Sequence, residues 1–125
     1  LTNWVCSCDD LERKVADFPI KLGDIMNVSR GGVNWKISVP ESGILPFDEL
    51  FPAFIKWQSK ENHPSKKLKP SNYFLNKLTI SHPQGEEIKL LLRDLKDNRV
   101  SFNVSDHYSL SAELFNKSGK KVVLE

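Results

Sequence analysis

The chain has 125 residues, of which 39% are apolar and 27% are charged, and its formal net charge is +2. This length suits one ordinary domain or two small modules that share a core. The composition is typical of a folded, soluble protein, and no apolar run reaches the roughly 18–20 residues that span a bilayer. The near balance of acidic and basic residues argues against a nucleic-acid partner or a membrane partner.

The first part of the chain predicts a strand, a helix and three more strands. The first strand covers residues 1–7, and the helix covers residues 9–18. Asp9 can cap this helix, Glu12 completes a capping-box pattern, and Pro19 ends the helix. Three extended stretches with period-2 alternation follow at residues 25–29, 32–39 and 50–57.

The same order of elements returns in the last part of the chain. A strand is predicted at residues 77–82 and a helix at residues 85–95, and strands follow at residues 100–105, 108–116 and 120–125. The fold class is therefore α+β, with two tandem βαβββ modules. We place the modules at residues 1–58 and 77–125, joined by a basic, proline-containing linker at residues 59–76. Neither module covers its own sheet well, so we expect the two to pair around a shared surface.

Two local features of the chain each have an ordinary interpretation and a functional one. The lysines of the linker belong to a solvated loop or form a rim that attracts anions. Cys6 and Cys8 share one face of the first strand, where small buried side chains in a reducing compartment are the ordinary interpretation. A metal or redox role would need further ligands, and none is present. Without a signal peptide, these cysteines predict a cytoplasmic protein.

The chain contains, in this order, the strings Asn3-Trp4-Val5, Asp9-Asp10-Leu11, Ser29-Arg30-Gly31-Gly32, Leu50-Phe-Pro-Ala-Phe-Ile-Lys-Trp57, His63-Pro64-Ser65 and Leu78-Thr-Ile-Ser-His-Pro83. The two tandem βαβββ modules resemble the vicinal oxygen chelate superfamily, and these strings resemble its glyoxalase-like domain branch, which suggests a bacterial protein. The resemblance covers nearly the whole chain and implies a further module upstream, in agreement with a start at Leu1 rather than Met.

The resemblance implies a curved mixed sheet around a small-molecule site. In this superfamily a divalent metal is held by His or Gln on the first strand and by Glu on the fourth strand of each module. Here those positions fall on Asn3, a poor ligand, and on Lys56, a cation; Thr79 faces the site from the second module, and Glu125 stands at the last position. No metal ligand is therefore assigned within this chain, and a divalent cofactor would depend mostly on residues outside it.

Four other residues are candidates for the site. His63 is a candidate catalytic acid or base, or a donor that polarises a carbonyl; a surface or hydrogen-bonding histidine is the ordinary alternative. Trp35 and Trp57 pack in the core or stack on a flat ligand. Arg30 precedes two glycines that form a bulge with positive φ, the favoured interpretation, or an anion-binding nest.

Three functional hypotheses follow from these residues and from the resemblance. The first is a glyoxalase-like domain that binds a small organic molecule and supports lyase, isomerase or dioxygenase chemistry. The second is a metal-free binding module, like the resistance proteins of the same superfamily. The third is a structural half without a site of its own, for which a homodimer is the natural assembly.

Overall fold

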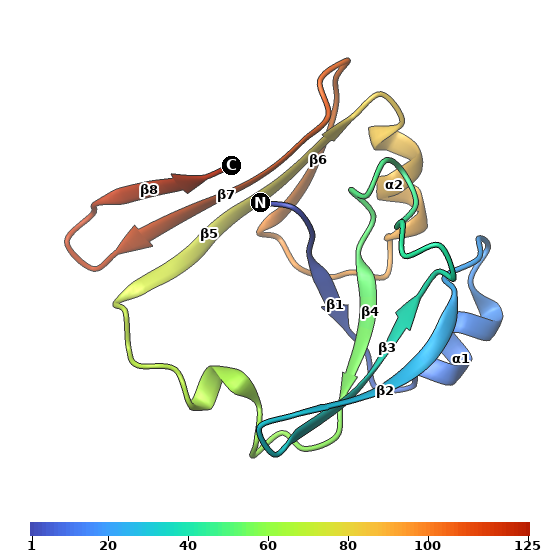
Figure 1. The fold of residues 1–125 in the computed structure, drawn as a ribbon. Coiled ribbons are helices and arrows are strands. Elements are labelled where there is room, and N and C mark those ends of the chain that lie inside the picture. Colours follow the sequence, from blue (N-terminus) through green and yellow to red (C-terminus); the bar gives the residue numbers. More distant parts are fainter. The chain divides into compact units, whose positions relative to one another are not determined.

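The computed structural model describes residues 1–125, and it contains two helices and eight strands in two mixed sheets (Figure 1). The predicted α+β class with βαβββ modules is confirmed. In chain order the elements are β1 (Val5–Ser7), α1 (Leu11–Asp17), β2 (Asp24–Arg30), β3 (Val33–Val39), β4 (Ala53–Trp57), the 3₁₀ helix η1 (Pro64–Lys66), β5 (Tyr73–His82), α2 (Gly85–Leu91), β6 (Val100–Val104), β7 (Ser109–Asn116) and β8 (Lys121–Leu124).

The chain forms two compact units. The first-sheet unit consists of Trp4–Pro46 and Pro52–Lys69, and the second-sheet unit consists of Leu1–Asn3, Phe47–Phe51 and Pro70–Glu125. The second-sheet unit therefore includes two short pieces from the first half of the chain. The predicted module and linker boundaries stay a prediction.

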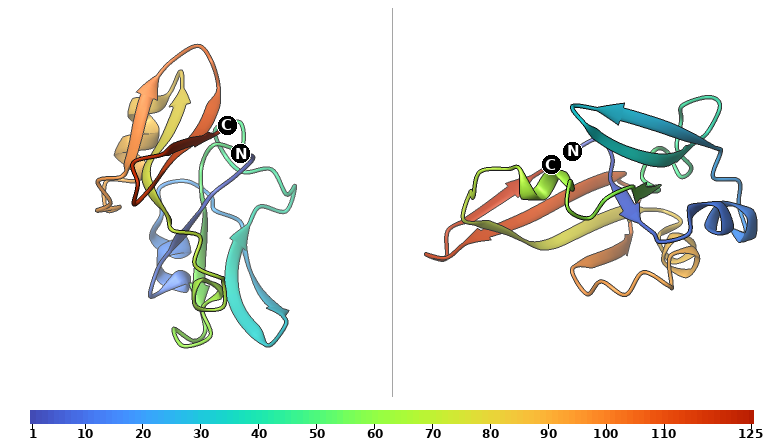
Figure 2. Two further views of the ribbon diagram at one scale, coloured as in Figure 1. Left: turned by 90° about the vertical axis from the view of Figure 1, so that its left-hand side faces the viewer. Right: turned by 90° about the horizontal axis from the view of Figure 1, so that it is seen from below.

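The first-sheet unit orders its strands β1-β4-β3-β2, with β1 parallel to β4 and the other pairs antiparallel. Helix α1 contacts β3 and β4 (Figure 2). Its N-cap is Asp10 rather than the predicted Asp9, because the Asp10 carboxylate accepts the Arg13 amide at 3.1 Å. Glu12 accepts a hydrogen bond from Lys36 Nζ of β3 at 2.7 Å, which ties the helix to the sheet.

Apolar and polar side chains alternate along β3 as predicted, but the one buried side chain, Ser38, belongs to the polar set. Ser38 is 1% exposed, whereas Trp35 and Ile37 are only half-buried. The Ser38 hydroxyl accepts the Phe54 amide at 3.4 Å, which satisfies this polar group in the core. Cys6 is buried, as predicted for the first strand, and Cys8 is half-buried; both are free thiols.

The second-sheet unit orders its strands β6-β5-β7-β8. Helix α2 is the crossover between the parallel strands β5 and β6, and β7 pairs antiparallel with both β5 and β8. The element order of the first module returns, but the strand order does not: β1 lies beside β4, whereas β5 lies between β6 and β7. The last strands of the two modules therefore have different neighbours: β4 lies between β1 and β3, whereas β8 pairs only with β7.

Several boundaries differ from the sequence-based expectation. Strand β4 begins at Ala53 rather than Leu50, and α1 covers Leu11–Asp17 rather than residues 9–18. The first strand begins at Val5 rather than Leu1, and β5 begins at Tyr73 rather than Lys77. Helix α2 ends at Leu91 rather than Leu95, because Leu92 leaves the helical region at φ −100° and ψ 21°.

The two glycines after Arg30, Gly31 and Gly32, have φ of +57° and +78°. They form a two-residue hairpin turn, since Arg30 pairs with Val33 in an unbroken register, and not the predicted bulge.

One loop contains an unusual backbone conformation. Phe47, Asp48 and Glu49 have φ values of 54°, 54° and 68°, so three consecutive non-glycine residues adopt the left-handed region. Each such residue costs about 1–2 kcal/mol of conformational free energy.

Neither helix has the length and apolar character required to cross a bilayer.

Candidate functional site

The first-sheet unit contains a pocket of about 450 Å³ where β1 and β4 end, which we call the Lys56 pocket. Cys8, immediately after β1, donates its amide to Ile55 O of β4 at 2.9 Å, so the two strand ends are held together. The loop that follows β4 supplies the remaining wall. The residues that line the pocket include Cys8, Asp9, Lys56, Trp57, Lys60 and His63.

His63 occupies a defined orientation at the wall of this pocket. As the N-cap of η1, it accepts the Ser65 amide at Nδ1 (3.2 Å), and the same nitrogen lies 2.7 Å from the Ser65 hydroxyl. Its ring contacts Trp57 edge-on, with 4.8 Å between the centroids. Since Nδ1 accepts, the neutral ring has its hydrogen on Nε2. His63 therefore offers a hydrogen-bond donor rather than the free lone pair of a general base.

The charge in the pocket is positive. Lys56 and Lys60 are opposed only by Asp9 among the lining residues. Lys56 stands opposite Lys36 in the register of β3 and β4, an unfavourable like-charge pair. Lys36 is neutralised by Glu12 at 2.7 Å, whereas Lys56 forms no ion pair. The Lys56 ammonium is therefore available to a ligand.

Cys8 contributes a neutral thiol to the wall. Burial is the largest influence and raises the pKa of the Cys8 thiol above its usual value of 9.0, and the carboxylates of Asp9 and Asp10 act in the same direction. Lys14 and Lys56 act against this shift but do not reverse it. The nucleophilic thiolate is thus a minor form at neutral pH.

Two tryptophans extend the site along the sheet. The rings of Trp35 and Trp57 contact each other at 5.4 Å between centroids. A second pocket of about 320 Å³ is lined by Asn27, Trp35, Lys36, Lys56 and Gln58. Gln58 also lines the Lys56 pocket. The structure thus brings together four predicted site residues, Trp35, Lys56, Trp57 and His63.

The other predicted site residues lie elsewhere. Arg30 is exposed at the β2–β3 turn and lines neither pocket. Thr79 lies on β5 in the second-sheet unit, with its hydroxyl 3.3 Å from Ser101 Oγ. Asn3 was expected on the first strand, but it precedes β1 and is exposed, because the parallel pairing with β4 begins at Val5.

Sequence reasoning did not single out Asp9 or Gln58 as site residues, and it included Lys60 only among the linker lysines that could form an anion-attracting rim. All three lie just beyond strand ends, where the loop conformation decides whether a side chain reaches a pocket. The only signal available was their position, since residues after neighbouring strand ends meet at one edge of a sheet.

The positions that the superfamily uses for a divalent metal do not fit one here. Asn3 lies outside β1, and Lys56 places an ammonium where a carboxylate would be needed. Glu125 follows β8, which pairs with β7 and not with β5. In addition, no three His, Cys, Asp or Glu side chains gather into a group that could hold a metal ion.

Comparison with known proteins agrees with this architecture. Residues 1–95 match the model of a family described as Glyoxalase-like domain. Neither the curated proteins nor the solved structures gave a match. The matched segment includes the whole first-sheet unit together with β5 and α2. Because this match spans well over half of the sequence, the chain belongs to the glyoxalase-like domain family of the vicinal oxygen chelate superfamily.

Proposed function

We propose that the Lys56 pocket binds a small organic anion without the help of a metal ion. One observation carries the proposal: Lys56, Lys60 and His63 line the same pocket, and Lys56 has no carboxylate partner. The Nε2–H of His63 remains available as a donor, because Nδ1 accepts the Ser65 amide. A carboxylate or enolate oxygen would satisfy these donors through charge-assisted hydrogen bonds. The edge of the pocket formed by Trp57 favours a ligand with a flat, apolar body.

The chemistry available to such a ligand is limited by the same contacts. The lone pair of His63 Nδ1 is used within η1, and the Cys8 thiol is neutral, so neither is a ready base or nucleophile. Donors around a carbonyl or enolate oxygen would still stabilise negative charge on that oxygen. Lyase, isomerase or dioxygenase chemistry would require a metal held by ligands that these residues do not supply. We therefore favour ligand binding over catalysis for this pocket.

Benzoate and its uncharged counterpart benzamide provide a test. With ¹⁵N-labelled protein and EDTA in the buffer, benzoate should shift the amide signals of residues 56–63, and benzamide should bind at least about fivefold more weakly. Repeating the titration with Mn²⁺ in place of EDTA tests the metal-dependent alternative. Equal binding of benzoate and benzamide, or benzoate binding only with the metal, would contradict the proposal.

The variant Lys56→Met tests whether the Lys56 ammonium is the cation that binds benzoate. Losing one charge-assisted contact at a half-buried site should weaken benzoate binding about tenfold. Lys66→Met is the matched control, since Lys66 lies in η1 and does not line the pocket. An equal effect of the two variants would show that benzoate responds only to overall charge.

A further inference from the structure

The second-sheet unit has a pocket of its own, of about 430 Å³, which we call the Asp48 pocket. The residues that line it are Leu1, Asp48, Leu50, Tyr108, Ser109, Leu110, Ser111 and Glu125. No Lys, Arg or His lines it. This pocket shares no residue with the Lys56 pocket, and the two differ in the sign of their charge.

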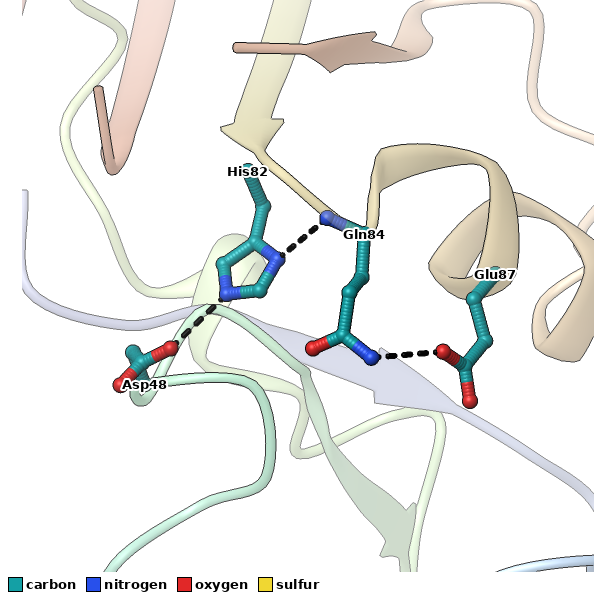
Figure 3. Close-up of polar contacts among 4 residues, drawn as sticks. All are labelled: Asp48, His82, Gln84 and Glu87. Atoms are coloured by element: carbon teal, nitrogen blue, oxygen red, sulfur yellow. Dashed lines mark hydrogen bonds and ion pairs between the residues drawn. The ribbon is translucent and has the colours of Figure 1, made fainter. Parts of the chain in front are cut away.

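Asp48 is positioned by a buried histidine. His82, at the end of β5, is 2% exposed, and its Nε2 lies 2.8 Å from Asp48 Oδ2 (Figure 3). On the other side of the ring, His82 Nδ1 accepts the Gln84 amide at 2.9 Å. The side chain of Gln84 turns away and donates to Glu87 at 2.8 Å. His82 thus links the loop that carries Asp48 to the start of α2.

These contacts determine the charge state of the pair. Because the Gln84 amide is a donor, His82 Nδ1 must present a lone pair, and the ring hydrogen then lies on Nε2, where it is donated to Asp48. The imidazole is therefore neutral. Asp48 keeps its full negative charge with no cationic partner, and Oδ1 forms no hydrogen bond.

An aromatic surface lies beside this carboxylate. The Tyr108 ring stacks on His82, with 4.9 Å between centroids and 19° between planes, and Phe47 contacts the edge of the His82 ring at 5.8 Å. Tyr108 is 58% exposed, so the ring face that is not against His82 is accessible. A ring face beside an uncompensated carboxylate attracts a cation through two separate interactions.

We propose that the Asp48 pocket binds a small organic cation of the primary or quaternary ammonium class. Asp48 Oδ1 faces the positive charge, Tyr108 supplies a cation–π contact, and the hydroxyls of Ser109 and Ser111 accept remaining N–H groups of a primary ammonium. His82 is a positioning residue that holds the carboxylate without neutralising it. The site is independent of the proposed anion site.

Benzylammonium and the uncharged benzyl alcohol test the charge requirement. Titrated into the ¹⁵N-labelled 125-residue protein, benzylammonium should shift the amide signals of Asp48 and residues 108–111 and bind at least about fivefold more tightly than benzyl alcohol. No shift in this segment, or equal affinity of the two compounds, would overturn the proposal. The Lys56 pocket acts as an internal reference, because benzoate binding there should not change.

Asp48→Asn removes the charge and retains the shape, and Asn tolerates the left-handed backbone, so the variant should fold. Benzylammonium affinity should fall at least about tenfold. Glu49→Gln is the matched control: it removes the same charge from the next exposed residue of the same left-handed turn. Equal losses in both variants would show that only the general field matters and would reject Asp48 as a ligand-binding residue.

The protonation state of His82 gives a readout that a merely structural role would not predict. Long-range ¹H–¹⁵N spectra at neutral pH should show a proton on Nε2 and none on Nδ1. If both nitrogens are protonated, Asp48 already has a cationic partner and the inference fails. In a folded His82→Gln variant, the preference for benzylammonium over benzyl alcohol should decrease; an unchanged preference would remove the positioning role.

Discussion

A single turn before β6 shows how strongly neighbouring side chains control one another at the residue scale. The Asp97 carboxylate accepts from Arg99 Nη2 at 2.6 Å, Arg99 Nε at 2.9 Å and the Arg99 amide at 3.0 Å. This bidentate pair lowers the pKa of Asp97 from 3.8 to about 2, mainly through the side-chain hydrogen bonds of Arg99. The same contact raises the pKa of Arg99.

The pair predicts a defined response to acid. Because the folded-state pKa of Asp97 lies below the unfolded value, its stabilising contribution is complete above about pH 3.8 and disappears as the pH falls towards 2. An NMR titration of the Asp97 carboxyl carbon should place its midpoint near 2, and Arg99→Gln should move it towards 3.8. Lys96→Gln is the control for a general loss of positive charge; a similar shift in that variant would contradict the assignment to Arg99.

The candidate site was partly predictable at this scale. Trp35, Lys56, Trp57 and His63 were selected from strand alternation and family resemblance, and they do gather at one edge of the first sheet. The pairing of Asp48 with His82 was not predictable, since it joins a loop to the end of β5 through a left-handed turn without a glycine to signal it. Local sequence patterns contain no information about such a contact.

At the scale of elements, the packing of α2 depends on the absence of a side chain. A Cβ on Gly85 would lie 2.5 Å from Asn103 O and 2.8 Å from Asn103 C of β6. The backbone of β6 cannot move away without breaking its pairing with β5. Gly85 therefore allows the first turn of α2 to approach the sheet closely.

The variant Gly85→Ala should lower the free energy of unfolding by roughly 3 kcal/mol through this clash, as measured by urea denaturation. Gly119→Ala is the matched control, because nothing lies within 4 Å of its Cβ position and only its φ of +86° opposes alanine. That control should cost about 1 kcal/mol. Amide shifts in β6 should change for Gly85→Ala only. A smaller loss at Gly85 than at Gly119 would contradict the steric argument.

Every predicted helix and strand exists, because each depends on a local period of apolar residues or on a local stop signal. Strand pairing was not predictable in the same way. The second module repeats the element order of the first, yet β5 lies between β6 and β7. Which strands pair depends on the packing of residues distant in sequence, such as the buried Ile80, Ile88 and Leu92, and alternation within one strand does not encode it.

At the scale of the whole molecule, the two compact units are not consecutive along the chain. Phe47–Phe51 belongs to the second-sheet unit although it lies between β3 and β4 of the first-sheet unit. This segment supplies the Asp48 partner of His82, and its Leu50 and Phe51 are 7% and 0% exposed. A cut in the linker would therefore separate the second-sheet unit from part of its own interior.

This arrangement predicts that the fragment Pro70–Glu125 does not fold alone. Its ¹H–¹⁵N spectrum should show poorly dispersed amide signals, and thermal unfolding should lack a cooperative transition, in contrast to the full chain. The loss of two buried side chains exceeds what a domain of this size tolerates. A dispersed spectrum from the isolated fragment would show that Phe47–Phe51 is dispensable for folding of the second-sheet unit.

The parallel pairing of β1 with β4 also has a consequence for the order in which the chain folds. The β2–β3 hairpin closes across two glycines, so its ends meet quickly, whereas Val5 and its partner Ala53 are separated by 48 positions. With only three residues, β1 gains little until β4 is already in place beside β3. We expect β1 to dock last during folding and to be the first strand to detach, so its amide protons should exchange with solvent faster than those of β3.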